Sequence, residues 1–144
     1  MGGEAAMSLH FRVEGTPTPQ GSMRSYGHGI MVSDNPRLHA WRDMVTLRAK
    51  EAMRAMEPFA GAVDVTLVFT LPRPKSVSVA KRPMHTVKPD LDKLVRACFD
   101  ALTSAGAWRD DAAVVRVTAI KCYESRGQAV GCEVWVCDAE AVRA

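Results

Sequence analysis

Four aspartates in two short motifs are the residues of this chain whose types and spacing could support chemistry. Asp90 and Asp92 lie in the run Lys-Pro-Asp-Leu-Asp-Lys, and Asp110 and Asp111 are adjacent farther along the chain. Carboxylates gathered in one place repel one another unless a cation neutralises them. Oxygen-only ligands favour Mg²⁺ or Mn²⁺ over zinc. The two motifs therefore indicate a divalent-metal site of the kind that assists phosphodiester cleavage.

Acids with this spacing can also be structural or bind calcium. Pro89 disfavours helical geometry at Lys88, so a helix should begin at or just after Asp90, where acidic residues often cap a helix. The positive end of the helix dipole also favours Asp92 in the first turn, so both acids can simply stabilise the helix. A calcium loop is the competing metal site, but the spacing lacks the distal Glu of an EF-hand.

The helix expected over residues 90–104 favours a functional role for the acids. Asp92 and Arg96 lie one turn apart on a shared face. That face is separate from an apolar stripe that consists of Leu91, Leu94, Val95, Cys98 and Leu102. Asp110 and Asp111 precede a strand, and we expect a short connection to return this pair toward the helix start.

A positively charged loop precedes the first acidic motif. Residues 72–89 contain no Asp or Glu, and their cations are Arg73, Lys75, Lys81, Arg82 and Lys88. Such an excess attracts phosphate, although a solvated loop without a partner is the simpler alternative. Beside a carboxylate cluster, the loop fits a nuclease in which it would hold the phosphates that flank the cleaved bond.

The remaining pattern predicts the elements that must position these groups. Strands are expected at 8–14, around 30–32, 62–71, 113–123 and 129–137. One helix should start at Pro36 and end at Pro58, and the other covers 90–104. This order suggests an α/β (α+β) fold in which two main helices pack on a small mixed sheet. The strand at 113–123 alternates Val115, Val117 and Ala119 with polar residues.

Length and composition limit the class of protein. The chain has 144 residues, of which 47% are hydrophobic and 24% charged, with a net charge of +3. These values fit one globular domain over residues 1–144, with 1–7 and 139–144 as flexible ends, and exclude collagen-like and coiled-coil classes. Apolar runs are too short to span a bilayer and the N-terminus lacks a signal-peptide pattern, so we expect a cytoplasmic protein without a membrane partner.

The cysteines and histidines do not predict a zinc site. The four cysteines include no Cys-x-x-Cys pair, and the four histidines are scattered. Cys98 and Cys122 are expected to be buried small apolar side chains. Trp108 is expected to pack in the core, and His85 to be a solvated loop residue.

The segment from Lys88 to Lys121 resembles the RusA-type Holliday junction resolvases. It contains Lys-Pro-Asp-Leu-Asp-Lys-Leu-Val-Arg-Ala-Cys-Phe-Asp-Ala-Leu and then Ala-Gly-Ala-Trp-Arg-Asp-Asp-Ala-Ala-Val-Val. Residues 13–17, Val-Glu-Gly-Thr-Pro, are similar to the first strand and the Gly-x-Pro turn of that family. These motifs cover a minority of the chain, but the segment order agrees throughout.

The resemblance implies a small homodimer that cleaves four-way DNA junctions with Mg²⁺, or with Mn²⁺ as a substitute. Asp90, Asp92 and Asp111 occupy the positions of the family's metal-binding catalytic carboxylates, and Asp110 would assist or be structural. Two sites related by a twofold axis would nick two opposed strands, leaving 3′-hydroxyl and 5′-phosphate ends. The expected setting is DNA recombination and repair in a bacterial or phage-infected cell, with no small-molecule cofactor.

Two residues depart from the family pattern. Lys93 stands where the family usually has Asn, and Arg96 stands where it has a catalytically important Lys. Arginine keeps the charge and can clamp phosphate, but it does not readily lose a proton. We therefore expect Arg96 to be the fourth catalytic residue, with an electrostatic role. Further DNA contacts are expected from Lys75, Lys81, Arg82, Lys88, Lys93, Arg24 and Arg109.

Several functions compete with that of a Holliday junction resolvase. A broader nuclease would act on flaps, forks or replication intermediates. A catalytically weak or silent protein would bind branched DNA without cutting it, and the changes at Lys93 and Arg96 would then mark lost activity. A structural or RNA-binding module is the least favoured, because the sequence contains no aromatic stacking platform or RNA motif.

Overall fold

A computed structural model describes residues 7–21, 23–25, 31–33 and 36–139. Its main sheet contains β1 (Ser8–Glu14), β4 (Val63–Leu71), β5 (Val114–Tyr123) and β6 (Gly131–Asp138), in the order β1-β6-β4-β5. The β4–β5 pair is parallel, whereas β6 pairs antiparallel with β1 and β4, so the predicted mixed sheet is confirmed. A separate two-stranded sheet contains β2 (Met23–Ser25) and β3 (Met31–Ser33). The strand predicted around 30–32 corresponds to β3.

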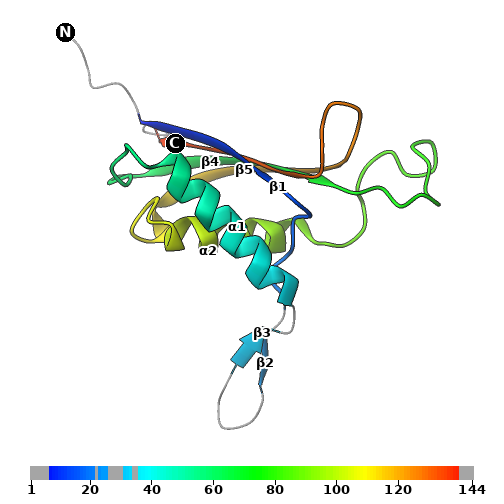
Figure 1. Ribbon diagram of the computed structural model, residues 1–144, viewed down its shortest axis with the longest axis horizontal. Coiled ribbons are helices and arrows are strands. Elements are labelled where there is room, and N and C mark those ends of the chain that lie inside the picture. Colours follow the sequence, from blue (N-terminus) through cyan, green and yellow to red (C-terminus); the bar gives the residue numbers. More distant parts are fainter. Residues whose placement is uncertain (1–6, 22, 26–30, 34–35, 140–144) are drawn as a thin grey trace.

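Two helices lie on the same side of the main sheet, as predicted (Figure 1). They are α1 (Pro36–Ala52) and α2 (Leu91–Ser104). The expected end of the first helix at Pro58 is wrong, because a turn follows Ala52. That turn brings Phe59 into the core, where its amide donates to the Ala107 carbonyl at 2.8 Å. None of the described helices is long and apolar enough to cross a membrane.

The core fills the space between the sheet and the two helices. Alternate residues of β1, β4 and β6 point into it, and both helices contribute one apolar stripe. The buried residues of α2 are Leu94, Ala97, Cys98, Ala101 and Leu102, which confirms most of the predicted stripe. Trp108 is also buried, and its Nε1 donates to Thr103 Oγ1 at 2.8 Å. Burying each large apolar side chain contributes about 1.5–3 kcal/mol, so this layer holds α2 firmly in place.

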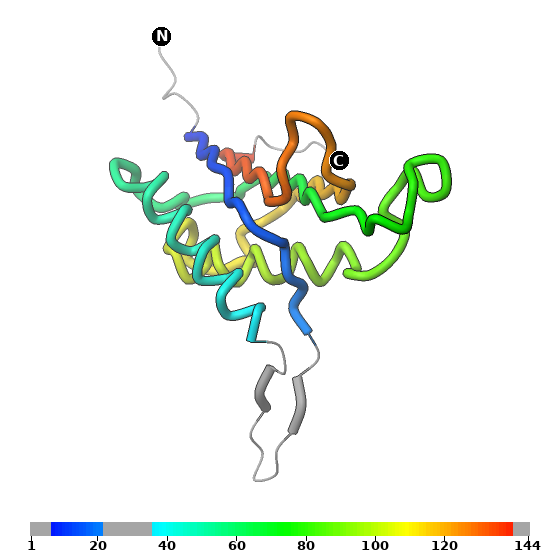
Figure 2. Tube along the Cα trace, turned by 45° about the vertical axis from the view of Figure 1, so that its right-hand side comes forward, coloured from blue at the N-terminus to red at the C-terminus, as the bar shows by residue number. Residues whose placement is uncertain are grey.

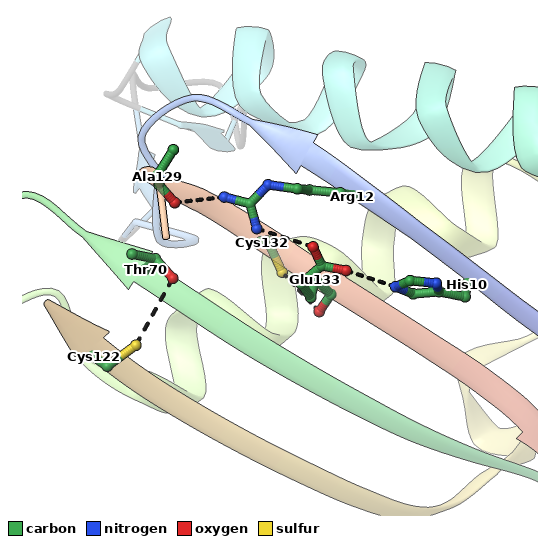
Figure 3. A network of polar contacts seen from close by, with 7 residues as sticks. All are labelled: His10, Arg12, Thr70, Cys122, Ala129, Cys132 and Glu133. Atoms are coloured by element: carbon green, nitrogen blue, oxygen red, sulfur yellow. Dashed lines mark hydrogen bonds and ion pairs between the residues drawn. The ribbon is translucent and has the colours of Figure 1, made fainter. Parts of the chain in front are cut away.

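The opposite face of the sheet carries a network of ion pairs (Figure 3). Glu133 accepts from Arg12 at 3.0 Å and lies 2.6 Å from the ring nitrogen of His10, which stacks on Trp135. Burial raises the pKa of Glu133, but the hydrogen bonds from His10 and Arg12 outweigh it and lower the value. The same face holds the half-buried Cys122, whose sulfur lies 3.8 Å from the Thr70 hydroxyl. These groups satisfy one another and stabilise the pairing of the strands.

The strand β5 departs from its predicted alternation. It occupies one margin of the main sheet, and half of its residues are exposed. Val115 and Val117 are 57% and 45% exposed, although Val117 pairs with the fully buried Val65. A strand at the margin has a neighbour on one side only, so a period-two pattern there does not guarantee a buried face.

The positively charged segment 72–89 is an irregular loop, as predicted. Figure 2 shows it leaving β4 and returning to the start of α2 at the same end of the molecule. The guanidinium of Arg73 lies 3.9 Å from the centre of the Tyr123 ring, and Arg82 donates to the Tyr123 hydroxyl at 3.1 Å. Two of its cations thus attach the loop to the end of β5.

Candidate active site

The carboxylate of Asp90 does not take part in capping the helix it precedes. Asp90 occupies the N-cap position of α2 with extended backbone, yet its side chain makes no capping hydrogen bond within the described residues. It pairs with Lys93, whose Nζ lies 3.7 Å from Oδ2, and both side chains are about half exposed. A helix-capping role for this acid is therefore disfavoured, because its exposed side chain makes no hydrogen bond to the backbone at the helix start.

Asp92 and Arg96 follow on the exposed side of α2. Asp92 lies in the first turn and Arg96 one turn later. No ion pair joins the two side chains in the described part of the chain. The guanidinium of Arg96 therefore does not neutralise Asp92 and is oriented to solvent, where it can meet an anionic ligand.

Lys121 positions the backbone that carries Asp90. Its Nζ reaches from β5 and donates to the carbonyls of Val87 and Pro89 at 2.7 and 2.8 Å. Hydrogen bonds from a charged donor are roughly twice as strong as neutral ones. This residue is missing from the prediction, because its only signal in the sequence is a lysine inside an apolar strand between Ile120 and Cys122.

The two carboxylates of the second acidic pair differ in their contacts, because only Asp110 caps a turn. Asp110 caps the short 3₁₀ turn η1 (Asp111–Ala113), because its Oδ1 accepts from the Ala112 amide at 2.9 Å. That hydrogen bond, and then one from Asp111, lowers the pKa of Asp110. The pKa of Asp111 is raised, chiefly by the same bond to Asp110. Asp110 thus has a structural role, and Asp111 makes no capping contact within the described residues.

The two acidic motifs lie near opposite ends of α2. Asp110 and Asp111 line a hollow of about 460 Å³ together with Asp100 and Thr103, in the C-terminal half of the helix. Asp92 and Asp100 are eight residues apart, which corresponds to about 12 Å along a helix. The expected return of the second pair to the helix start does not occur within one chain.

A single chain therefore supplies only part of a metal site. Asp90 and Asp92 offer the exposed oxygen ligands that Mg²⁺ prefers. Among the described residues, however, no group of three or more His, Cys, Asp or Glu side chains could hold a metal ion. The acids fit a magnesium site in chemistry, but one chain does not bring Asp111 to the other two.

A cavity of about 850 Å³ opens beside Asp90. Lys88 and Lys93 contribute to its lining, together with Trp41 and His85. The prediction of a solvated His85 is wrong, because the loop folds back and the ring packs against Tyr123 at 4.7 Å between centres. Burial, and then the charge of Lys121, lowers the pKa of His85.

The predicted DNA-binding cations differ in their surroundings. Arg82 is bound to Tyr123 and Lys93 to Asp90, so both also have structural contacts. The side chain of Arg24 lies outside the described residues. The remaining predicted contacts are exposed, and they are Lys75, Lys81, Lys88 and Arg109.

Comparison with known proteins gives consistent matches. The family whose description is Endodeoxyribonuclease RusA matches residues 13–134, a span that contains both acidic motifs. The crossover junction endodeoxyribonucleases RusA of Shigella sonnei (strain Ss046) and Escherichia coli (strain K12) are each 32% identical to this chain over 117 residues. The crossover junction endodeoxyribonuclease of Enterobacteria phage 82 is 53% identical over 117 residues. Each alignment covers 77% of this chain and 82% of the relative.

Proposed function

This chain belongs to the RusA family of endodeoxyribonucleases, and from that premise we propose that it resolves Holliday junctions by metal-dependent cleavage of two opposed strands. The observation that carries the proposal is the exposed carboxylate of Asp90. It stands at a helix start without capping the helix, directly after a basic loop. A carboxylate that stabilises its own helix would need no such loop, whereas a nuclease needs both.

Each residue at the start of α2 has a role in this proposal. Asp90 and Asp92 supply metal-binding oxygens, and Lys121 holds the preceding backbone so that Asp90 keeps its position. Arg96 contributes a fixed positive charge on the same exposed side and stabilises the charge that develops on the phosphate. Because arginine stays protonated, this role is electrostatic. Lys88 and the exposed loop lysines bind phosphates that flank the cleaved bond.

The proposed metal is Mg²⁺, held by Asp90 and Asp92 of one chain and by Asp111 of a second copy. When bound, Mg²⁺ neutralises the phosphate oxygens and favours deprotonation of water. The separation of Asp111 from the other acids in one chain supports a shared site. Two copies related by a twofold axis would then form two equivalent sites, which suits the symmetry of a four-way junction.

An exposed apolar strip next to Asp111 supports association of two copies. Val115 and Val117 follow Asp111 closely in the chain and lie at the free margin of the sheet. Exposed apolar strand margins are covered in most folded proteins. Size-exclusion chromatography with light scattering should give a dimer mass, and Val117→Asp should shift the protein to monomer. A monomer mass for the unchanged chain would contradict the shared site.

Cleavage of a mobile four-way junction tests the proposed function. Linear duplex and flap substrates serve as controls, and each reaction is run with and without Mg²⁺. Symmetric nicks in opposed strands of the junction, only with metal, are the expected result. Preferred cutting of flaps would favour a broader nuclease. Tight junction binding without cleavage in Mg²⁺ or Mn²⁺ would favour a silent binding protein.

A further inference from the structure

The cavity beside Asp90 contains two buried polar atoms that lack partners. Trp41 and His85 are 5% and 8% exposed, and both line the cavity. Trp41 Nε1 and His85 Nδ1 have no hydrogen-bond partner among the described residues. Unsatisfied buried polar atoms are uncommon and unfavourable in native proteins, so two of them around one cavity point to a ligand that satisfies them.

The chemistry of these atoms limits the ligand. An indole nitrogen only donates, so the ligand must present an acceptor to Trp41. A neutral imidazole donates or accepts at Nδ1 according to its tautomer, so His85 can face either kind of group. The burial of His85 and the charges of Lys121 and Arg82 favour the neutral ring. The ligand must therefore carry at least one acceptor, and the group that faces His85 can be an acceptor or a donor.

The walls of the cavity suit a flat, largely apolar ligand. Trp41 and Tyr123 contribute aromatic rings, and Pro17, Met44 and Val87 contribute apolar surface. The Tyr123 wall is fixed, because Arg73 stacks on its ring and Arg82 binds its hydroxyl. Preformed cavities of this size that combine apolar and aromatic walls with a few polar groups commonly bind small molecules.

Two lysines that line the cavity can bind a phosphate attached to such a ligand. Lys88, Lys93 and Asp90 all line the cavity, and Lys93 Nζ lies 3.7 Å from Asp90 Oδ2. A nucleotide combines a flat base, carbonyl acceptors along its edge and an anionic phosphate. We infer that the cavity receives one nucleobase displaced from the base stack of branched DNA, with the adjoining phosphate beside Lys88 and Asp90. This inference rests on the proposed function and adds a site that reads the DNA next to the cut.

Binding measured without divalent metal tests the cavity separately from cleavage. The probes are four-way junctions with one abasic position, placed in turn at each nucleotide near the crossover. Stacking of a base on aromatic side chains corresponds to roughly a tenfold change in affinity or more. We expect one position at which the abasic junction binds the unchanged protein about tenfold more weakly than the intact junction.

Two cavity variants should reduce that dependence on the base. Trp41→Phe keeps an aromatic ring but removes the donor, and Ala40→Trp fills the cavity from an exposed position on α1. In Ala40→Trp the abasic penalty should fall to about twofold or less, because the base can no longer enter the cavity. In Trp41→Phe, which keeps a ring for stacking and loses only the donor, the penalty should fall by a smaller factor. Trp108→Phe is the matched control, since Trp108 is a buried tryptophan whose nitrogen is already bonded to Thr103. It should keep the full penalty.

Several outcomes would overturn the inference. One is an abasic penalty that stays the same in Ala40→Trp and Trp41→Phe, with folding of both variants verified by thermal melting. Another is the absence of any penalty at all positions in the unchanged protein. Failure of cleavage with a retained, cavity-dependent abasic penalty would contradict the proposed nuclease function and leave the base-binding site in place.

Discussion

The two ends of α2 carry similar acidic residues in different surroundings. At the start of the helix, Asp90 and Asp92 are exposed, and Asp90 lies 3.7 Å from the ammonium of Lys93. Beyond its end, Asp110 and Asp111 are also exposed, but Asp110 caps a turn and its proximity raises the pKa of Asp111. The first end adjoins a basic loop and a large cavity, whereas the second adjoins a small hollow.

This difference indicates how the functions are divided between the two ends. The start of α2 has the means to bind DNA, since cations, a cavity and a fixed backbone surround its acids. The other end has a carboxylate, Asp111, and exposed valines that can contact another protein surface. The proposed nuclease site therefore combines the start of one α2 with the Asp111 region of another copy.

The largest expected effect follows from removing one proposed metal-binding carboxylate. Asp90→Asn, Asp92→Asn and Asp111→Asn should each reduce junction cleavage by more than about 100-fold, because even partners of metal ligands change activity by 10–100-fold. Binding to the junction should remain, since the fold and the loop charge are unchanged. Cleavage and metal-free binding are measured on the same junction. If all three variants lost binding to the same extent as cleavage, the two helix ends would not form a catalytic site.

A smaller effect is expected from the basic loop. Lys75→Gln combined with Lys81→Gln should weaken junction binding and reduce the slope of log affinity against log salt by about two, because each lost phosphate contact removes about 0.9. Junction affinity is measured by binding titrations at salt concentrations between about 50 and 200 mM. Lys50→Gln with Arg54→Gln, in the last turn of α1 and the turn that follows it, is the control and should leave the slope unchanged. An unaltered slope in the loop variant would show that the DNA phosphates contact another surface of the protein.

Lys121 is expected to act on cleavage by positioning the backbone that precedes Asp90. Lys121→Met removes both hydrogen bonds to the backbone before Asp90 and should lower kcat about tenfold, as expected for lost charged hydrogen bonds. KM should change less than twofold, and Lys121→Arg should restore part of the rate. Lys50→Met is the matched surface control. A change confined to KM would indicate that Lys121 contacts DNA rather than positioning Asp90.

The smallest expected effect concerns the second acidic pair. Asp110→Asn removes the charge and the hydrogen bond that raise the pKa of Asp111, so Asp111 should ionise at a lower pH than in the unchanged protein. Carboxyl chemical shifts measured against pH in the metal-free protein report this value. Asp43→Asn, on the exposed side of α1, should have no effect. An unchanged Asp111 titration would show that the two acids are not in contact.

The sequence predicts the elements of this fold better than their relative positions. The helix start after Pro89 and the apolar stripe of α2 depend on residues close in the chain, so local patterns reveal them. The predicted end of α1 is wrong because Phe59 contacts Ala107, which is distant in sequence. The burial of His85 depends on Tyr123 in the same way.

The same limitation applies to the candidate site. The types and spacing of Asp90, Asp92 and Asp111 predict metal-binding chemistry from local motifs. The strand β5 starts beside the C-terminal half of α2, and Lys121, near the other end of β5, donates to Pro89, so Asp111 lies far from the helix start. The spacing of residues in the sequence does not reveal the direction in which β5 runs past α2, because that direction results from the parallel pairing of β5 with β4.

A purified mixed dimer tests the shared site most directly. Asp92→Asn and Asp111→Asn chains carry different tags, and only dimers that contain one chain of each kind are collected. A shared site predicts that one of the two sites then contains only unchanged acids, so the mixed dimer nicks one strand of the junction although both parent dimers are inactive. Equal inactivity of the mixed dimer and its parents would contradict the account, because it would show that Asp92 and Asp111 act within the same chain.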